Sequence, residues 1–312
     1  MTVERKPLHH YWAPRYWPTW FGMGLLRLVC LLPHKAALAV GRGIGKLAFH
    51  LSASRRGIVR RNIELCFPKL SATEQAELIR RHFDAMGMSV IEMGLGRWAT
   101  DRHLTAITQL RGIEHLQQVV DRGQGIILLS AHFTTLEISG RVLALNSPPF
   151  DAVYRKNRSD FITEIQRTGR ERAAEDTIEK RDIKKMVRSL RNGRPVWYAP
   201  DQSYSRKGSE VIEFMGVPGM HTTATSTLAR LGKAATIPFF PRRMPDGNYE
   251  LTLLAPLENF PSDDPIADTR QYLAALEAHL QTCPEQYFWV HRKFKDLPEG
   301  YPDYYADLDA SK

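Results

Sequence analysis

The feature that most constrains the fold is a run of four large aliphatic residues, Ile126 to Leu129, that leads directly into a turn. An uninterrupted apolar run of this length is typical of a strand buried on both faces. The next segment, Leu136 to Leu145, has the apolar spacing of a helix packed behind that strand. His132 therefore lies where a strand ends, and this is the edge at which open α/β sheets present their reactive groups.

Glu137 follows His132 at a spacing written H-x4-E. Five residues on one helix correspond to about 140° of rotation, so the two side chains meet only if His132 is in the turn and Glu137 in the first helical turn. The carboxylate would then accept a hydrogen bond from one ring nitrogen and leave the other as a base. The alternative is a structural histidine at a strand end, beside a surface glutamate.

The remaining sequence predicts one α/β domain, because strand and helix patterns alternate without a Pro/Gly/Ser-rich linker. Ser71-x-x-Glu74 is a capping box that predicts a helix reaching about Met93. We expect a mixed, mostly parallel sheet with helices on both faces. Its predicted strands are 126–129, 150–154, 196–199, 211–215, 236–240 and 249–254. The other predicted helices are 113–121, 161–169, 183–190, 224–231 and 269–281.

The N-terminal region predicts a helical membrane anchor over residues 1–56, followed by an acyltransferase-like α/β domain over residues 57–312. Aromatic residues precede an apolar run from Thr19 to Leu32, which contains Arg27 and is shorter than the ~20 residues of a spanning helix. This pattern favours an interfacial or oblique anchor, with the spanning form left open. The alternatives are an ordinary core helix and a cleaved signal peptide.

The composition narrows the possible partners. With 43 Lys and Arg against 34 Asp and Glu, the formal net charge is +9, which favours anionic membranes, nucleic acid or acidic ligands such as phosphorylated lipids and acyl carrier protein. Cys30, Cys66 and Cys283 are odd in number and far apart, which predicts neither a disulfide framework nor a zinc site. No glycine-rich phosphate loop is present, so no nucleotide cofactor is expected.

Around the His132 motif the chain resembles the late acyltransferases of lipid A biosynthesis, the lauroyl and myristoyl group. The order and spacing of the matching segments hold from about Arg60 to Tyr301. These segments are Val153-Tyr154-Arg155-x-Asn157, Arg181-Asp182-x-Lys184, Val196-Trp197-Tyr198-Ala199-Pro200-Asp201, Thr222-Thr223, Pro238-Phe239-x-Pro241-Arg242-Arg243, Pro284-Glu285-Gln286-Tyr287-x-Trp289 and His291-Arg292-x-Phe294-Lys295. One position departs from the family, which often has a second acidic residue where this chain has Ser203, so only Asp201 carries over.

The resemblance implies transfer of a fatty acyl chain from acyl carrier protein to a hydroxyacyl chain of a lipid A precursor, for lipopolysaccharide synthesis. It places the reaction at the cytoplasmic face of the bacterial inner membrane and implies no metal, no other cofactor and no nucleic-acid partner. His132 would be the general base, and Glu137 would orient the imidazole and balance its charge.

The same resemblance implies a set of substrate-binding residues. Arg155 would serve the oxyanion, a sugar phosphate or the carrier's phosphopantetheine, and Asp201 would hold Arg155 or a sugar hydroxyl. The candidates for the acceptor's phosphates are Arg242, Arg243, His291, Arg292, Lys293 and Lys295, with arginine better suited to bidentate contact.

Two other functions are compatible with the residues. A thioesterase would use His132 and Glu137 to activate water, and a non-enzymatic basic protein of the membrane surface would bind anionic lipid or nucleic acid through charge alone. The sequence leaves open the donor chain length, the acylated position, the need for sugars on the acceptor and the oligomeric state.

Overall fold

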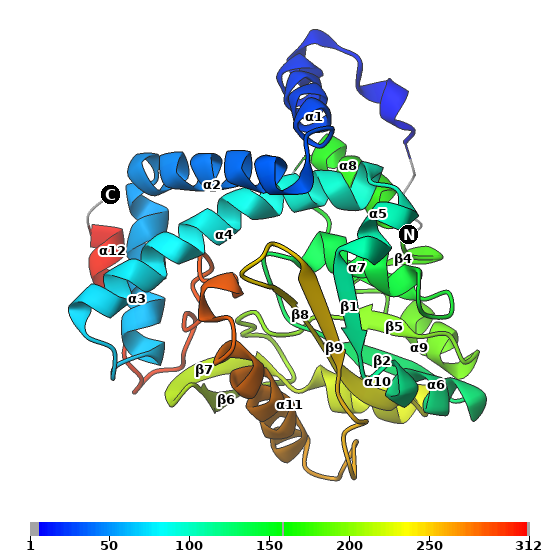
Figure 1. The fold of residues 1–312 in the computed structure, drawn as a ribbon. Helices are drawn as coiled ribbons and strands as arrows, with labels where there is room; N and C mark the ends of the chain where they lie inside the picture. The colour runs from blue at the N-terminus through cyan, green and yellow to red at the C-terminus, as the bar shows by residue number, and fades with distance from the viewer. Residues whose placement is uncertain (1–5, 158, 311–312) are drawn as a thin grey trace.

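The computed structural model describes residues 6–157 and 159–310, and a seven-stranded sheet forms its centre (Figure 1). The sheet has the order β1-β9-β8-β2-β5-β3-β4, and β6 and β7 form a separate hairpin. The strands are β1 (Thr108–Arg111), β2 (Ile126–Leu129), β3 (Asp151–Tyr154), β4 (Asp176–Glu179), β5 (Val196–Tyr198), β6 (Ser209–Phe214), β7 (Val217–Thr222), β8 (Ala235–Arg243) and β9 (Tyr249–Leu253).

Helices surround this sheet, and three short 3-10 turns join them. The α-helices are α1 (Trp17–Val29), α2 (His34–Leu51), α3 (Ala53–Cys66), α4 (Ala72–Trp98), α5 (Asp101–Ala106), α6 (Ile113–Asp121), α7 (Leu136–Ala144), α8 (Asp160–Arg170), α9 (Ile183–Arg191), α10 (Ala224–Gly232), α11 (Pro265–Leu280) and α12 (Ala306–Ala310). The 3-10 turns are η1 (Leu8–Tyr11), η2 (Pro14–Tyr16) and η3 (Pro284–Gln286).

The sheet is mixed and mostly parallel, as the sequence predicted. β8, β2, β5, β3 and β4 run in one direction, whereas β9 pairs antiparallel with β8 and parallel with β1. The carboxyl ends of the five parallel strands therefore meet at one edge of the sheet. Loops that follow those strands bring distant parts of the chain together there.

The apolar run of β2 is buried because helices cover both faces of the sheet. Ile126 and Leu128 belong to one buried cluster, which includes residues of α6 and α7. Ile127 and Leu129 belong to another, which includes residues of α9, α10 and α11. Alternate side chains of a strand point to opposite faces, so a strand with two buried faces has no polar position.

Two long helices lie across one side of the sheet (Figure 1). The predicted capping box is confirmed at the start of α4, where Ser71 and Glu74 exchange hydrogen bonds, and the helix continues to Trp98. α2 crosses α4 at very short range, because glycines stand on both helices at the crossing. A Cβ atom on Gly45 would lie 2.1 Å from the carbonyl oxygen of Phe83. The face of α2 that carries these glycines packs against α4, whereas its other faces can remain exposed.

The N-terminal region differs from part of the prediction. α1 covers most of the predicted apolar run, and Figure 1 shows it projecting from the body of the molecule. Among residues 6–157 and 159–310, no helix has both the length and the apolar character needed to cross a membrane. Residues 1–5 of the predicted anchor lie outside the described residues, and the predicted boundary after residue 56 lies within α3.

Candidate functional site

His132 stands in a short turn between β2 and α7, at the carboxyl edge of the sheet. A second segment holds this turn on both sides. The backbone N–H of Thr134 donates to the carbonyl of Gln286 (2.8 Å), and the N–H of Phe288 donates to the carbonyl of His132 (3.0 Å). The turn that carries the histidine is thus held by two backbone hydrogen bonds to a distant segment, which limits the directions its ring can take.

Asp201, in the loop after β5, is the hydrogen-bond partner of the His132 ring. Its Oδ1 lies 2.6 Å from Nδ1 of His132, and its Oδ2 accepts the backbone N–H of the same residue at 3.1 Å. The Asp201 side chain is 1% exposed, whereas the His132 side chain is 31% exposed. Because a carboxylate can only accept here, Nδ1 carries the proton, and Nε2 is left with the lone pair of a base.

Burial opposes ionisation of Asp201, yet its pKa is held below the usual range. The opposite charge and hydrogen bonds of His132 and the ammonium of Lys293 outweigh the loss of hydration. The carboxylate is therefore ionised at neutral pH, as it must be to orient the imidazole and to balance an imidazolium.

Glu137 does not orient His132, and this part of the prediction is corrected. Arg170, the last residue of α8, donates Nε to both carboxylate oxygens of Glu137, at 3.2 and 3.1 Å, and Nη2 to one of them at 2.5 Å. No hydrogen bond joins His132 to Glu137 in the described part of the chain. The physical reason is that α7 directs Glu137 toward α8, whereas Nδ1 of His132 faces the loop after the neighbouring strand β5.

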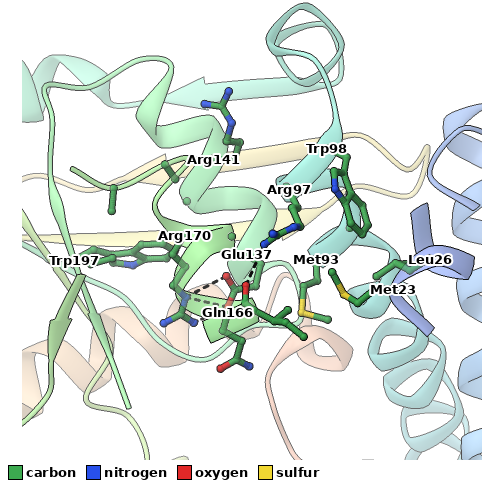
Figure 2. A pocket seen from close by; sticks show the side chains of 18 of the residues that line it. Met23, Leu26, Met93, Arg97, Trp98, Glu137, Arg141, Gln166, Arg170 and Trp197 are labelled. Carbon is green, nitrogen blue, oxygen red and sulfur yellow. Dashed lines mark hydrogen bonds and ion pairs between the residues drawn. The ribbon is translucent and has the colours of Figure 1, made fainter. Parts of the chain in front are cut away.

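An apolar pocket is lined in part by the Glu137–Arg170 pair (Figure 2). Its walls come from α1, α4, α7, α8 and β5. They include Met23, Leu26, Met93, Trp98, Phe150, Ile165, Ala173 and Trp197. A concave, mostly apolar space with a few polar groups at one end is the usual form of a small-ligand site.

The structure separates the predicted phosphate-binding residues. Arg243 is 7% exposed, and its guanidinium holds Glu92 through two nitrogen–oxygen contacts, at 2.5 and 2.8 Å. It is a buried ion-pair residue, so it is not available to a phosphate. Lys293 is also buried, at 4% exposed. The ion pair of Arg243 could not be predicted from sequence, because its partner Glu92 lies 151 positions away.

The other candidates lie nearer the surface. Arg242 contacts Glu250 at 2.7 Å, Lys295 contacts Asp296 at 2.9 Å, and the Arg292 guanidinium lies 5.4 Å from the ring centre of Tyr305. Arg155 is exposed directly after β3, but Asp201 holds His132 rather than Arg155. His291 lies beside the site, with its ring centre 6.5 Å from that of His132, and burial together with the His132 charge lowers its pKa to about 4.

Two side chains at the site were not predicted. Arg170 was missed because nothing in its local sequence links it to Glu137, 33 positions earlier. His221 is 2% exposed beside Asp201 and Lys293, and the charge on Lys293 adds to its burial in lowering its pKa. Within residues 6–157 and 159–310, no group of three or more His, Cys, Asp or Glu side chains is arranged to hold a metal ion.

Comparison with known proteins identifies the family of this chain. The family model described as bacterial lipid A biosynthesis acyltransferase matches residues 5–296. The chain is 38% identical to the lipid A biosynthesis lauroyltransferase of Escherichia coli K12 over 94% of its own length and 96% of that protein. It is 34% identical to the palmitoleoyltransferase of the same organism, over 95% and 96% of the two chains, and 23% identical to its myristoyltransferase, over 92% and 90%. From the match of nearly its whole length, the chain belongs to the bacterial lipid A biosynthesis acyltransferases.

Proposed function

We propose that the protein transfers a fatty acyl chain from acyl carrier protein to a hydroxyacyl chain of a lipid A precursor, with His132 as general base. The observation that carries this proposal is the 2.6 Å contact between Nδ1 of His132 and Asp201. It fixes the tautomer in which Nε2 is unprotonated, on a ring that is still 31% exposed. Family membership supports acyl transfer in lipid A biosynthesis as the reaction.

In the proposed reaction, Nε2 of His132 takes the proton of the acceptor hydroxyl as its oxygen attacks the thioester carbonyl carbon. The tetrahedral intermediate then expels the carrier's thiolate, which receives the proton from the imidazolium. An ester forms, a thioester breaks, and no acyl-enzyme is needed. Asp201 stabilises the imidazolium between the two steps. General-base catalysis of this kind contributes about 10²- to 10⁴-fold.

We assign the donor's acyl chain to the apolar pocket. The reacting carbonyl must lie at His132, in the turn that leads into α7, and Glu137 in the first turn of the same helix lines the pocket. The chain would then pass the Glu137–Arg170 pair, which lies between Trp197 and the α1 residues Met23 and Leu26 (Figure 2). The relatives are named for lauroyl, palmitoleoyl and myristoyl groups, so the family does not set the chain length.

Four cations near the site support an acidic carrier as donor, and we call Arg155, Lys180, Arg181 and Arg206 the basic cluster. Arg155 follows β3, and Lys180 and Arg181 follow its neighbour β4, where the N–H of Lys180 donates to the carbonyl of Tyr154 (2.8 Å). Burial and the charges of the other three cations lower the pKa of Lys180. An acidic protein surface would relieve this mutual repulsion, at the same sheet edge as His132.

We propose that the enzyme lies on the cytoplasmic face of the inner membrane through an exposed apolar stripe on α1 and α2. The stripe consists of Trp17, Phe21, Leu25 and Leu28 on α1 and Val40, Ile44, Leu47 and Leu51 on α2. Each set follows the i, i+4, i+7 or i+8 spacing of one helix face, and all eight residues are at least 38% exposed. The formal net charge of +9 suits an anionic leaflet.

The central test combines purified enzyme, lipid A precursor and acyl carrier protein thioesters, with products identified by mass spectrometry. Transfer predicts a lipid heavier by one fatty acid less one water. His132→Ala should abolish it, because the base is removed, and retention of more than about a tenth of the activity would contradict the general-base role. Release of free fatty acid with no acylated lipid would identify a thioesterase instead.

A further inference from the structure

Lys293 is a cation enclosed in the protein interior, directly behind Asp201. It is 4% exposed, and its Nζ donates a hydrogen bond to the main-chain carbonyl of Asp201. The ammonium also lies 4.5 Å from the ring centre of Phe214, on β6. A lysine so deeply buried is unusual unless it is paired or functional, because the loss of hydration of its charge costs several kcal/mol.

The groups that face Lys293 come from four different parts of the fold. They are Asp201 after β5, Cys66 at the end of α3, Glu277 on α11 and His221 on β7. Burial lowers the pKa of Lys293 to about 8, against the opposing charges of Asp201 and Glu277. The hydrogen bond of the ammonium nevertheless goes to a backbone carbonyl, so its direct contact is with the peptide that carries Asp201.

The position of the Asp201 peptide is tightly constrained. Asp201 must present Oδ1 to the Nδ1 of His132 and Oδ2 to the backbone N–H of the same residue at once. A rotation of the Asp201 peptide would break at least one of these contacts. The carbonyl of that peptide is the group that Lys293 binds, and the lysine's charge also favours the ionised carboxylate.

We infer that Lys293 is a positioning residue, whose ammonium fixes the Asp201 peptide and thereby sets the orientation of the His132 ring. This inference rests on the role proposed above for His132. A positioning role differs from a purely structural role because it affects turnover in the folded protein. Removing one buried charge while its charged partners remain leaves those partners uncompensated, so Lys293→Met should lower the melting temperature. A positioning role should lower turnover as well, even at temperatures well below the unfolding transition, where the variant is fully folded.

The first experiment compares Lys293→Met with wild type and with Lys69→Met, an exposed lysine in the turn between α3 and α4. Loss of the hydrogen bond from Lys293 to the Asp201 carbonyl should lower kcat by about 10²-fold, the scale of a 1 Å misplacement of a catalytic group. KM for the thioester should change little. Lys69→Met should behave as wild type. A fall in kcat that is reversed by any substitution that restores the melting temperature would show a purely structural role and overturn the inference.

The second experiment needs no activity, so it remains informative if the proposed reaction is wrong. The Nδ1 proton of His132, assigned by its loss in His132→Gln, is followed by nuclear magnetic resonance from pH 6.5 to 9.5. In wild type its resonance should shift as the Lys293 charge is lost near pH 8. The inflection should be absent in Lys293→Met, which has no charge to lose, and also in Lys293→Arg, because arginine stays protonated over this range. A wild-type resonance without inflection, or one unchanged in Lys293→Met, would overturn the inference.

Discussion

His132 and Asp201 occupy equivalent positions on neighbouring strands, each three residues beyond a paired strand end. Leu129, the last residue of β2, is in parallel register with Tyr198, the last residue of β5. The two loops therefore leave the sheet side by side, and the 2.6 Å contact between imidazole and carboxylate follows from strand pairing. Glu137, which follows the histidine in sequence, points from α7 toward Arg170 and forms an ion pair with it.

This relationship makes Asp201 more important than Glu137 for the His132 tautomer. Asp201→Asn places an amide N–H opposite Nδ1, which favours the tautomer with the proton on Nε2 and removes the base. We expect kcat to fall by between about 10²- and 10⁴-fold, the range for a lost or wrongly protonated base. Glu137→Gln should cost less, because an amide oxygen can still accept from Arg170. Steady-state kinetics on both variants test this ranking, and an equal or larger loss in Glu137→Gln would contradict it.

The pocket assignment predicts a change in donor preference. Ala173 lines the pocket and is half-buried, so Ala173→Leu would fill part of the space beside Arg170. We expect kcat/KM to shift toward shorter acyl chains, with each displaced methylene worth about 1–3 kcal/mol. A series of carrier thioesters of increasing chain length measures the shift. Ala106→Leu, on the exposed end of α5, is the matched control. An unchanged length profile in Ala173→Leu would place the chain elsewhere.

The basic cluster predicts a specific effect on the carrier. Lys180→Glu with Arg206→Glu should raise KM for the acyl carrier protein thioester at least about tenfold and reduce its salt dependence, because favourable charge pairs are reversed. The rate with a small acyl-pantetheine donor should hardly change. The control is Arg122→Glu with Lys233→Glu, exposed cations that precede β2 and β8 at the opposite edge of the sheet. Equal effects of the two double variants would show that only net charge matters.

Much of the sheet could be predicted from sequence, because its central strands are apolar on both faces. β2 was predicted with its observed bounds, and so was α6, whose apolar residues repeat with helical spacing. Three strands, β1, β4 and β7, were not predicted. β4 is an edge strand with Asp176 and Glu179 at its ends, and β1 has an exposed face, so neither carries a buried-strand pattern.

The partners within the site were harder to predict, because they depend on strand order. The sequence places His132 and Asp201 after two strands but does not say that β5, rather than β3, lies beside β2. The same limit applies to Arg243, which is in a matching family segment like the exposed Arg155 but meets Glu92 on α4 inside the protein. The sequence motifs predicted which charged residues lie near a strand end. Whether such a residue is already paired with an opposite charge depends on the fold.

The apolar stripe predicts binding to lipid vesicles. Phe21→Asp with Leu47→Asp should release the protein from vesicles containing anionic phosphatidylglycerol, because each buried side chain contributes about 1.5–3 kcal/mol. The control, Ile183→Asp with Leu231→Asp, changes two side chains that are each 43% exposed on α9 and α10. Cosedimentation measures the bound fraction. Equal binding of the two double variants, or a wild-type protein that stays in the supernatant, would contradict the proposed membrane face.

A buried histidine outside the site predicts how stability depends on pH. His82 is 0% exposed, and its Nδ1–H donates to the carbonyl of Glu285 at 2.9 Å. Burial lowers its pKa to about 4, whereas an unfolded histidine titrates near about 6.5. Between these values the unfolded chain binds a proton that the folded chain does not, so stability falls as the pH drops through this window.

His82→Asn should remove this contribution, because asparagine keeps an N–H donor for the Glu285 carbonyl but does not titrate. The variant's free energy of unfolding should lose up to about 1.4 kcal/mol less per pH unit than wild type between pH 6.5 and 4, which corresponds to one proton. Denaturant titrations across this range give the two slopes, with His50→Asn at the exposed end of α2 as control. The slope that remains in His82→Asn should include His279, whose pKa is also lowered to about 4 by burial. Identical slopes for wild type and His82→Asn would show that His82 is already protonated in the folded protein, and would contradict its lowered pKa.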